Sequence, residues 1–175
     1  MQGVTEPRPE PGVVTAAAKL HLTTRVASED DLQTCVELYR RFREDVAGER
    51  GAVVHLSREA FSEPLEARFT TILRDDRQNV LLGTLDAVPV GLAVGRLEDL
   101  ADSSRLAVID VLYVEPGARE VSVGESLLAV LVDWARTRGA TALDASVLPG
   151  MRQAKSFLEG SGFAARLLVM HQRLD

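Results

Sequence analysis

The segment over residues 112–126 constrains the fold of this chain more than any other. It reads Leu-Tyr-Val-Glu-Pro-Gly-Ala-Arg-Glu-Val-Ser-Val-Gly-Glu-Ser. This pattern predicts an apolar strand that breaks at Pro116, a short loop, and a helix that begins near Gly124. Backbone N–H groups at such a junction form a favourable anion site, which the helix dipole stabilises by ~0.3–2 kcal/mol. With Arg119 beside these groups, the junction predicts a site for a phosphate group.

The composition is that of one globular domain. The chain has 175 residues, within the usual range for a domain, and 46% of them are apolar and 26% charged. Residues 1–18 contain three prolines and two glycines, and we expect them to form a disordered tail. The remaining residues, 19–175, are expected to form a single domain.

Charge and hydropathy exclude several classes of partner. The net charge is −6 and no long basic block is present, which argues against nucleic-acid binding. No apolar run reaches the ~18–20 residues that cross a bilayer, and we see no secretion signal, so we expect no membrane partner. The single cysteine, Cys35, fits a reducing compartment, and its place on an apolar helical stripe predicts a core residue. We therefore expect a cytoplasmic protein.

Hydrophobic periodicity predicts an α+β fold with a mixed central sheet, in the order β-α-α-β-β-β-α-β-α-β. Strands are expected over Leu20–Val26, Val80–Leu85, Val88–Leu97, Arg105–Val114, Ala142–Val147 and Ala164–Leu174. Helices are expected after Ser28 as far as Gly48, from Ser57 to Arg74, from Gly124 to Gly139, and over Met151–Gly160. Ser28 and Asp31 resemble a capping box, Pro64 divides the second helix, and Asp86-Ala87 predicts a hairpin turn.

The loop over residues 119–124 reads Arg-Glu-Val-Ser-Val-Gly. It is similar to the pyrophosphate-binding motif of the GCN5-related N-acetyltransferase (GNAT) family, which is Arg or Gln, two residues, Gly, one residue, and Gly or Ala. Arg119 and Gly124 match this motif, whereas Ser122 replaces its first glycine. A serine can still donate its N–H and hydroxyl there if its dihedral angles are ordinary.

A second region, residues 148–163, also resembles the family, so that the resemblance covers residues 104–163. Three positions agree with the family pattern: Ala154, Gly162 and Phe163. Met151 stands where relatives often have asparagine, and Leu158 stands where a tyrosine commonly serves as the general acid. Because leucine cannot donate a proton, the departing thiolate must take one from water or another group, or leave unprotonated.

The resemblance implies a GNAT-like fold, in which a mainly antiparallel sheet is flanked by about four helices. It also implies acetyl-CoA as co-substrate and direct transfer of its acetyl group to a primary amine. The strand residues expected to pair with the pantetheine arm are Leu112, Tyr113 and Val114, and the backbone N–H of Leu112 is the expected oxyanion donor. The residues expected around the diphosphate are Arg119, Glu120, Val121, Ser122, Val123, Gly124, Glu125 and Ser126.

Acetyl transfer requires a base, because an amine with a pKa of ~10.4 is almost fully protonated at neutral pH. Asp110 is the only acid inside the apolar strand 106–112, where burial would raise its pKa into a useful range. The alternative is a structural carboxylate that bonds a neighbour or faces solvent. Asp144, inside the next strand, is a second candidate. His55, in the loop expected between the first two helices, either contributes to the acceptor pocket or is an exposed loop residue.

Other interpretations stay open. The departures at Ser122, Met151 and Leu158 are compatible with a catalytically inactive GNAT-like module that binds CoA or acyl-CoA as a regulatory or interaction domain. A third interpretation is that the chain shares the fold of the family but has no CoA-related function. The spacing of His, Cys and acidic residues predicts no metal site.

The acceptor is not specified by the sequence and is either a small molecule or a protein amino group. Glu98, Asp99 and Asp102 would attract a cationic acceptor, or they are simply solvated loop acids. The resemblance is compatible with a homodimer formed through the last strands, which the sequence does not decide.

Overall fold

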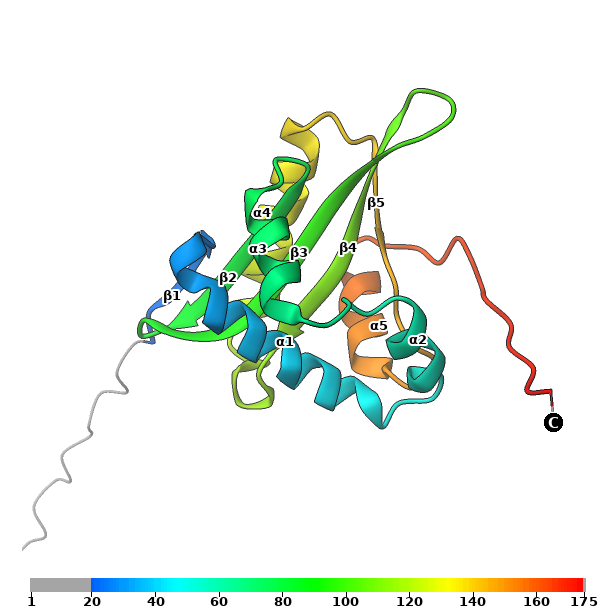
Figure 1. The fold of residues 1–175 in the computed structure, drawn as a ribbon, viewed down its shortest axis with the longest axis horizontal. Coiled ribbons are helices and arrows are strands. Elements are labelled where there is room, and N and C mark those ends of the chain that lie inside the picture. The colour runs from blue at the N-terminus through cyan, green and yellow to red at the C-terminus, as the bar shows by residue number, and fades with distance from the viewer. Residues whose placement is uncertain (1–19, 175) are drawn as a thin grey trace, which may run out of the picture.

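A five-stranded sheet forms the centre of the protein in the computed structural model, which describes residues 20–174 (Figure 1). The strands, in spatial order, are β1 (Leu22–Val26), β2 (Gln78–Leu85), β3 (Val88–Asp99), β4 (Arg105–Val114) and β5 (Ala142–Ala145). The first four pair antiparallel, and β5 pairs parallel to β4. The mixed, mainly antiparallel α+β fold is therefore confirmed, whereas the predicted tail 1–18 lies outside the described residues.

Helices cover both faces of the sheet (Figure 1). They are α1 (Leu32–Ala47), α2 (Ala52–Arg58), α3 (Leu65–Arg74), α4 (Val123–Thr137) and α5 (Arg152–Gly160), with short 3-10 turns η1 (Glu29–Asp31) and η2 (Pro116–Ala118). Side chains alternate along the strands between two cores, as a period of two requires. Thus Leu82 of β2 packs with α1 and α3, whereas its neighbour Leu81 packs with α4 and α5.

The start of the first helical region follows the predicted capping box. The Ser28 backbone N–H donates to the Asp31 carboxylate at 2.8 Å, and the Asp31 N–H donates to the Ser28 carbonyl at 3.0 Å. Arg25 of β1 donates to both Asp31 oxygens, at 2.6 and 2.7 Å. The first strand and the first helix are thus connected through one carboxylate. Cys35, as predicted, is fully buried in the core.

The predicted division of the second helix at Pro64 is confirmed, whereas the predicted start of its first piece at Ser57 is wrong. Ser57 lies inside α2 and donates its hydroxyl to the Val53 carbonyl at 2.6 Å, so it caps no helix. Residues 59–63 then form a connection, and Pro64 immediately precedes α3. A serine hydroxyl can bond the preceding helical turn as readily as it can cap a new one, which is why the sequence misplaced this start.

The last predicted strand, Ala164–Leu174, is also wrong, because residues 164–174 form neither a strand nor a helix. A strand forms only where a neighbouring strand supplies backbone partners, and this segment extends away from the sheet (Figure 1). Composition favoured a strand here, yet composition does not reveal whether a partner is available. The sheet therefore ends at β5.

Glycines on the sheet allow α4 to lie unusually close to it. A Cβ atom at Gly83 would come within 2.7 Å of Val123, and one at Gly91 within 2.9 Å of both Val123 and Leu127. At Gly95 a Cβ would meet Leu131 at 3.0 Å. The three glycines form a track on β2 and β3 that fixes the depth of α4, and with it the position of the helix N-terminus.

Candidate active site

The second half of β4 has a free edge. Strand β5 pairs with β4 only over Leu106–Ile109, so among residues 20–174 the rest of β4, Asp110–Val114, has a strand neighbour on its β3 side alone. Alternate backbone N–H and C=O groups of this half therefore face away from β3 and have no strand partner. The predicted pantetheine-binding residues Leu112, Tyr113 and Val114 all lie on it. This half of β4 is able to accept an extended chain as an additional strand.

The start of α4 lies directly beside this open half of β4. A Cβ atom at Gly124 would lie 3.7 Å from Val114 of β4 and 3.7 Å from the Phe157 ring of α5. Within the described residues, the backbone N–H groups of residues 120–125 donate to no protein acceptor. Bonds from Ala118 to Glu115 and from Ser126 to Ser122 flank this run. Six consecutive donors at a helix N-terminus are thus available to an anion.

Ser122 adopts the left-handed conformation, with φ 61° and ψ 17°. Its dihedral angles are therefore not the ordinary ones under which a serine was expected to replace the motif glycine without cost. The left-handed region costs a residue other than glycine roughly 1–2 kcal/mol. The backbone of the loop has the conformation that a glycine would adopt freely, and Ser122 maintains it under strain.

Arg119 is held by the protein itself. Its Nε donates to the Val114 carbonyl at 3.0 Å, and its guanidinium forms an ion pair with Asp45 of α1 at 2.6 Å. Asp45 lies 74 positions away in the chain and was not predicted from the sequence. Arg119 thereby connects the loop to β4 and α1, while Glu120 and Glu125 are exposed.

Asp110 lies at a β-bulge in β4. The register passes from Gly95–Ile109 to Val94–Val111 and leaves Asp110 without a paired residue on β3. Its side chain is only 17% exposed, and Arg96 of β3 donates from Nε to its Oδ1 at 2.9 Å. Burial raises the pKa of Asp110 above its ordinary value, and the charge of Arg96 offsets this only in part.

A cavity of about 500 Å³ lies in front of Asp110. Its polar lining comes from α2, the α2–α3 connection, α3, β3, β4 and the residue after β5: His55, Arg58, Glu59, Ser62, Arg68, Arg96, Asp110 and Ser146. His55 lies in α2 rather than in the expected loop, and its Nδ1 is 3.1 Å from the Glu59 carboxylate. The arginines were missed by the sequence reading. For Arg96 a signal existed, because one cation and one acid interrupt two apolar strands that were predicted to be neighbours.

Asp144 and Leu158 are less suited to proton transfer than Asp110. Arg166 donates to both oxygens of Asp144, at 2.8 and 2.9 Å, and this lowers the pKa of Asp144. A carboxylate with a lowered pKa is a weaker base than Asp110. Leu158 is buried in the core against α4 and offers no proton. Among residues 20–174, no cluster of three or more His, Cys, Asp or Glu side chains has the arrangement of a metal site.

These features define an α+β protein with free helix-start amides beside an open strand and a half-buried carboxylate. The family model of the acetyltransferase (GNAT) family matches residues 29–163. The chain therefore belongs to the GNAT family of acetyltransferases, whose members use acetyl-CoA, and it is an N-acetyltransferase by this membership. The predicted resemblance is confirmed.

Solved structures share the fold. An aminoglycoside acetyltransferase from an uncultured soil metagenomic sample, in complex with sisomicin, is 18% identical with a TM-score of 0.67, covering 88% of this chain and 95% of that one. The aminoglycoside N-acetyltransferase AAC(6')-Iy in complex with CoA is 20% identical with a TM-score of 0.67, covering 91% and 99%. A ribosomal-protein-alanine N-acetyltransferase from Brucella melitensis biovar Abortus 2308 is 16% identical with a TM-score of 0.66, covering 89% and 100%.

Two further findings concern curated relatives and membrane-spanning helices. No curated protein sequence matches this chain significantly. Among residues 20–174, no helix combines the length and the apolar character that crossing a bilayer requires.

Proposed function

We propose that this protein transfers an acetyl group from acetyl-CoA directly to a primary amine of a small molecule or protein. The observation that carries the proposal is the run of free backbone N–H groups over residues 120–125, next to the open half of β4. A diphosphate needs several donors at a positive helix end, and a pantetheine arm needs an unpaired strand. The two features adjoin each other at Gly124 and Val114.

In the proposed complex, the amides of residues 120–125 and the α4 dipole bind the diphosphate. The backbone of Leu112, Tyr113 and Val114 pairs with the pantetheine arm, and the Leu112 N–H stabilises the negative charge on the thioester oxygen. Arg119 orients the loop through Val114 and Asp45 rather than facing the anion as an isolated charge.

Asp110 acts as the general base in this proposal. The amine nitrogen attacks the thioester carbonyl carbon, the carbon–sulfur bond breaks, and the amine proton passes to Asp110 directly or through water. The raised pKa of Asp110 brings it closer to that of the group it deprotonates. Since Leu158 is buried and apolar, the thiolate takes its proton from water.

Thermal unfolding in the presence of acetyl-CoA tests the binding step. A ligand at 100 times its dissociation constant adds ~2.7 kcal/mol to the stability of the folded state, so we expect the melting temperature to rise. Thiol release across a panel of primary amines then tests the transfer. A shift without thiol release for any amine would favour the inactive CoA-binding module. No shift at millimolar acetyl-CoA would exclude both.

A further inference from the structure

The cavity in front of Asp110 contains more positive than negative charge. Three guanidinium groups line it, from Arg58, Arg68 and Arg96, against the carboxylates of Glu59 and Asp110. The positive charge of Arg96 is balanced, because its guanidinium donates hydrogen bonds to the carboxylates of Asp110 and Glu98. Within the described residues, Arg58 and Arg68 take part in no ion pair. Two cations of this cavity therefore form no ion pair, and the charge of Arg68 acts on Asp110 only from a greater distance.

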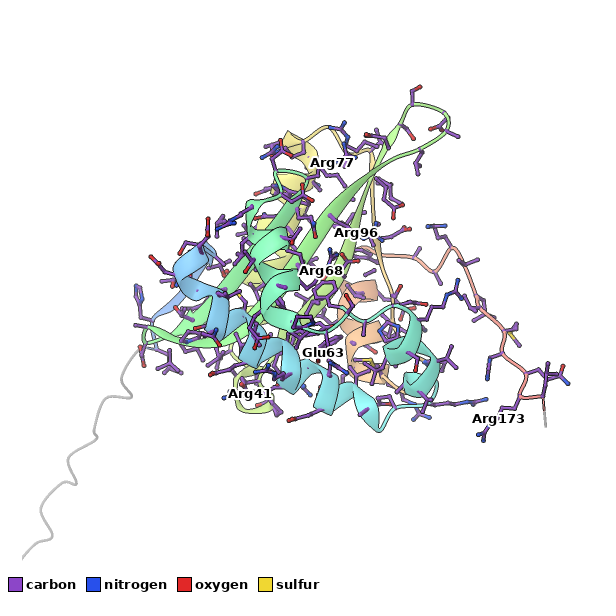
Figure 2. All side chains as sticks on the ribbon, in the orientation of Figure 1. Arg41, Glu63, Arg68, Arg77, Arg96 and Arg173 are labelled. Carbon is purple, nitrogen blue, oxygen red and sulfur yellow. The ribbon has the colours of Figure 1, made fainter. Side chains whose placement is uncertain are left out.

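Arg68 is the more informative of the two. It is half-buried on α3, and its guanidinium lies 5.2 Å from the centre of the Phe61 ring, which also lines the cavity. The face of an aromatic ring attracts a cation, but more weakly than a carboxylate does. A partly desolvated guanidinium has the geometry to bind a carboxylate or phosphate through two parallel hydrogen bonds. Arg68 and Arg96 appear together on the labelled side-chain view (Figure 2).

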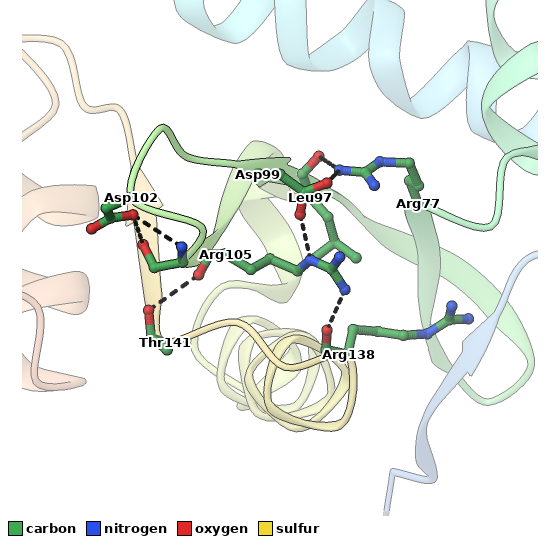
Figure 3. A network of polar contacts seen from close by, with 8 residues as sticks. Arg77, Leu97, Asp99, Asp102, Arg105, Arg138 and Thr141 are labelled. Atoms are coloured by element: carbon green, nitrogen blue, oxygen red, sulfur yellow. Dashed lines mark hydrogen bonds and ion pairs between the residues drawn. The ribbon is translucent and has the colours of Figure 1, made fainter.

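The acids that could attract a cationic acceptor are already engaged. Asp99 is bound by Arg77 at 2.9 Å and by Arg105 at 2.8 Å, and Asp102 accepts two hydrogen bonds from Ser104 (Figure 3). Glu98 is bonded by Arg96. These contacts hold the ends of β3 and β4 together and leave little free negative charge there. The expected attraction of this loop for a cation is thus largely cancelled.

We infer that the acceptor is a small primary amine that also carries an anionic group, a carboxylate or a phosphate. The anionic group binds Arg68 and Arg58, while the amine faces Asp110. The inference rests on the proposed acetyl transfer, and it names the class of acceptor for that same site. It also separates this protein from an enzyme for polycationic acceptors.

Three acceptors with the same five-carbon chain test the inference. They are 5-aminopentanoate, pentylamine and 1,5-diaminopentane, which end in a negative, neutral and positive group. We expect kcat/KM to be at least about tenfold higher for 5-aminopentanoate than for the other two, since hydrogen bonds to charged groups are strong. Phosphoethanolamine against ethanolamine shows whether phosphate serves better than carboxylate.

The variant Arg68→Gln should reduce the preference for 5-aminopentanoate over pentylamine, and Arg58→Gln should reduce it less. Arg136→Gln, on the exposed face of α4, is the matched control and should leave the preference intact. Circular dichroism verifies that each variant is folded. The rise in melting temperature with acetyl-CoA verifies that each variant binds the donor. A preference for the diamine, or an unchanged preference in Arg68→Gln, would overturn the inference.

Different results would contradict the acetyl transfer and the anionic acceptor. Loss of the acetyl-CoA shift would contradict the transferase function. A normal shift, combined with neither turnover nor calorimetric binding of 5-aminopentanoate or phosphoethanolamine to the CoA-saturated protein, would refute the anionic acceptor alone.

Discussion

Ser122 occupies a position where two backbone effects oppose each other. Its left-handed conformation costs roughly 1–2 kcal/mol, and glycine would remove that cost. Glycine in turn loses more conformational entropy on folding, by about 0.5–1 kcal/mol. We therefore expect Ser122→Gly to raise the free energy of unfolding by ~0.5–1 kcal/mol and to tighten acetyl-CoA binding. Urea denaturation measures the first effect and thermal shift the second.

The control is Ser156→Gly, which places the same substitution at an exposed site inside α5. There glycine removes no strain, so stability should fall by about 0.5 kcal/mol. If both variants lost stability equally, the strain at Ser122 would be refuted.

Asp110 should determine the acidic limb of the pH–rate profile. Because burial raises its pKa, the limb of kcat/KM should lie above the ordinary carboxyl pKa of ~3.9. Arg96 lowers this pKa, so Arg96→Gln should move the limb to higher pH. Asp110→Asn should reduce kcat by roughly 10²–10⁴-fold with an unchanged acetyl-CoA shift. Asp144→Asn serves as the control, and an unchanged limb in Asp110→Asn would remove Asp110 from the base role.

At the scale of elements, the position of α4 depends on the glycine track beneath it. Gly91→Ala would place a Cβ atom 2.9 Å from Val123 and Leu127 and 3.3 Å from the Tyr113 carbonyl. Overpacking of this kind costs typically ~1–3 kcal/mol. Since the helix must shift, acetyl-CoA binding should weaken as well. Gly48→Ala, where no atom lies within 4 Å of the new Cβ, should affect neither quantity in chemical denaturation and ligand titration.

Elements whose pattern is local were predictable from the sequence. The hairpin at Asp86-Ala87 has positive φ at both residues, and the turn signal indicated it. The division before α3 was indicated by Pro64, whereas the start of α2 was missed because Ser57 satisfies two local rules equally well. At the site, the loop 119–124 was recognisable as a motif, whereas the contact between Arg119 and Asp45 depends on how distant elements pack. Long-range side-chain partners are a property of the fold and not of any short pattern.

At the scale of the whole molecule, acid should destabilise the protein. Several acids that join elements have a pKa lowered by hydrogen bonds from arginine, among them Asp31 from Arg25, Asp99 from Arg105, and Asp144 from Arg166. A carboxyl whose pKa is lower in the folded state than in the unfolded one stabilises the protein above the unfolded pKa of ~3.9. That contribution is lost as the pH falls below ~4. Asp110, with its raised pKa, has the opposite sign, but it is a single group.

The melting temperature should therefore stay nearly constant from about pH 8 to 5 and fall steeply below about pH 4. Asp99→Asn removes one of these groups and should make the fall less steep, while Asp110→Asn should make it steeper, because the stabilising protonation of Asp110 is absent. Differential scanning calorimetry at constant ionic strength measures all three profiles, since salt weakens exposed ion pairs. A melting temperature that rises between pH 5 and 3 would show that buried carboxyls such as Asp110, rather than the arginine-bound ones, control the stability of the fold.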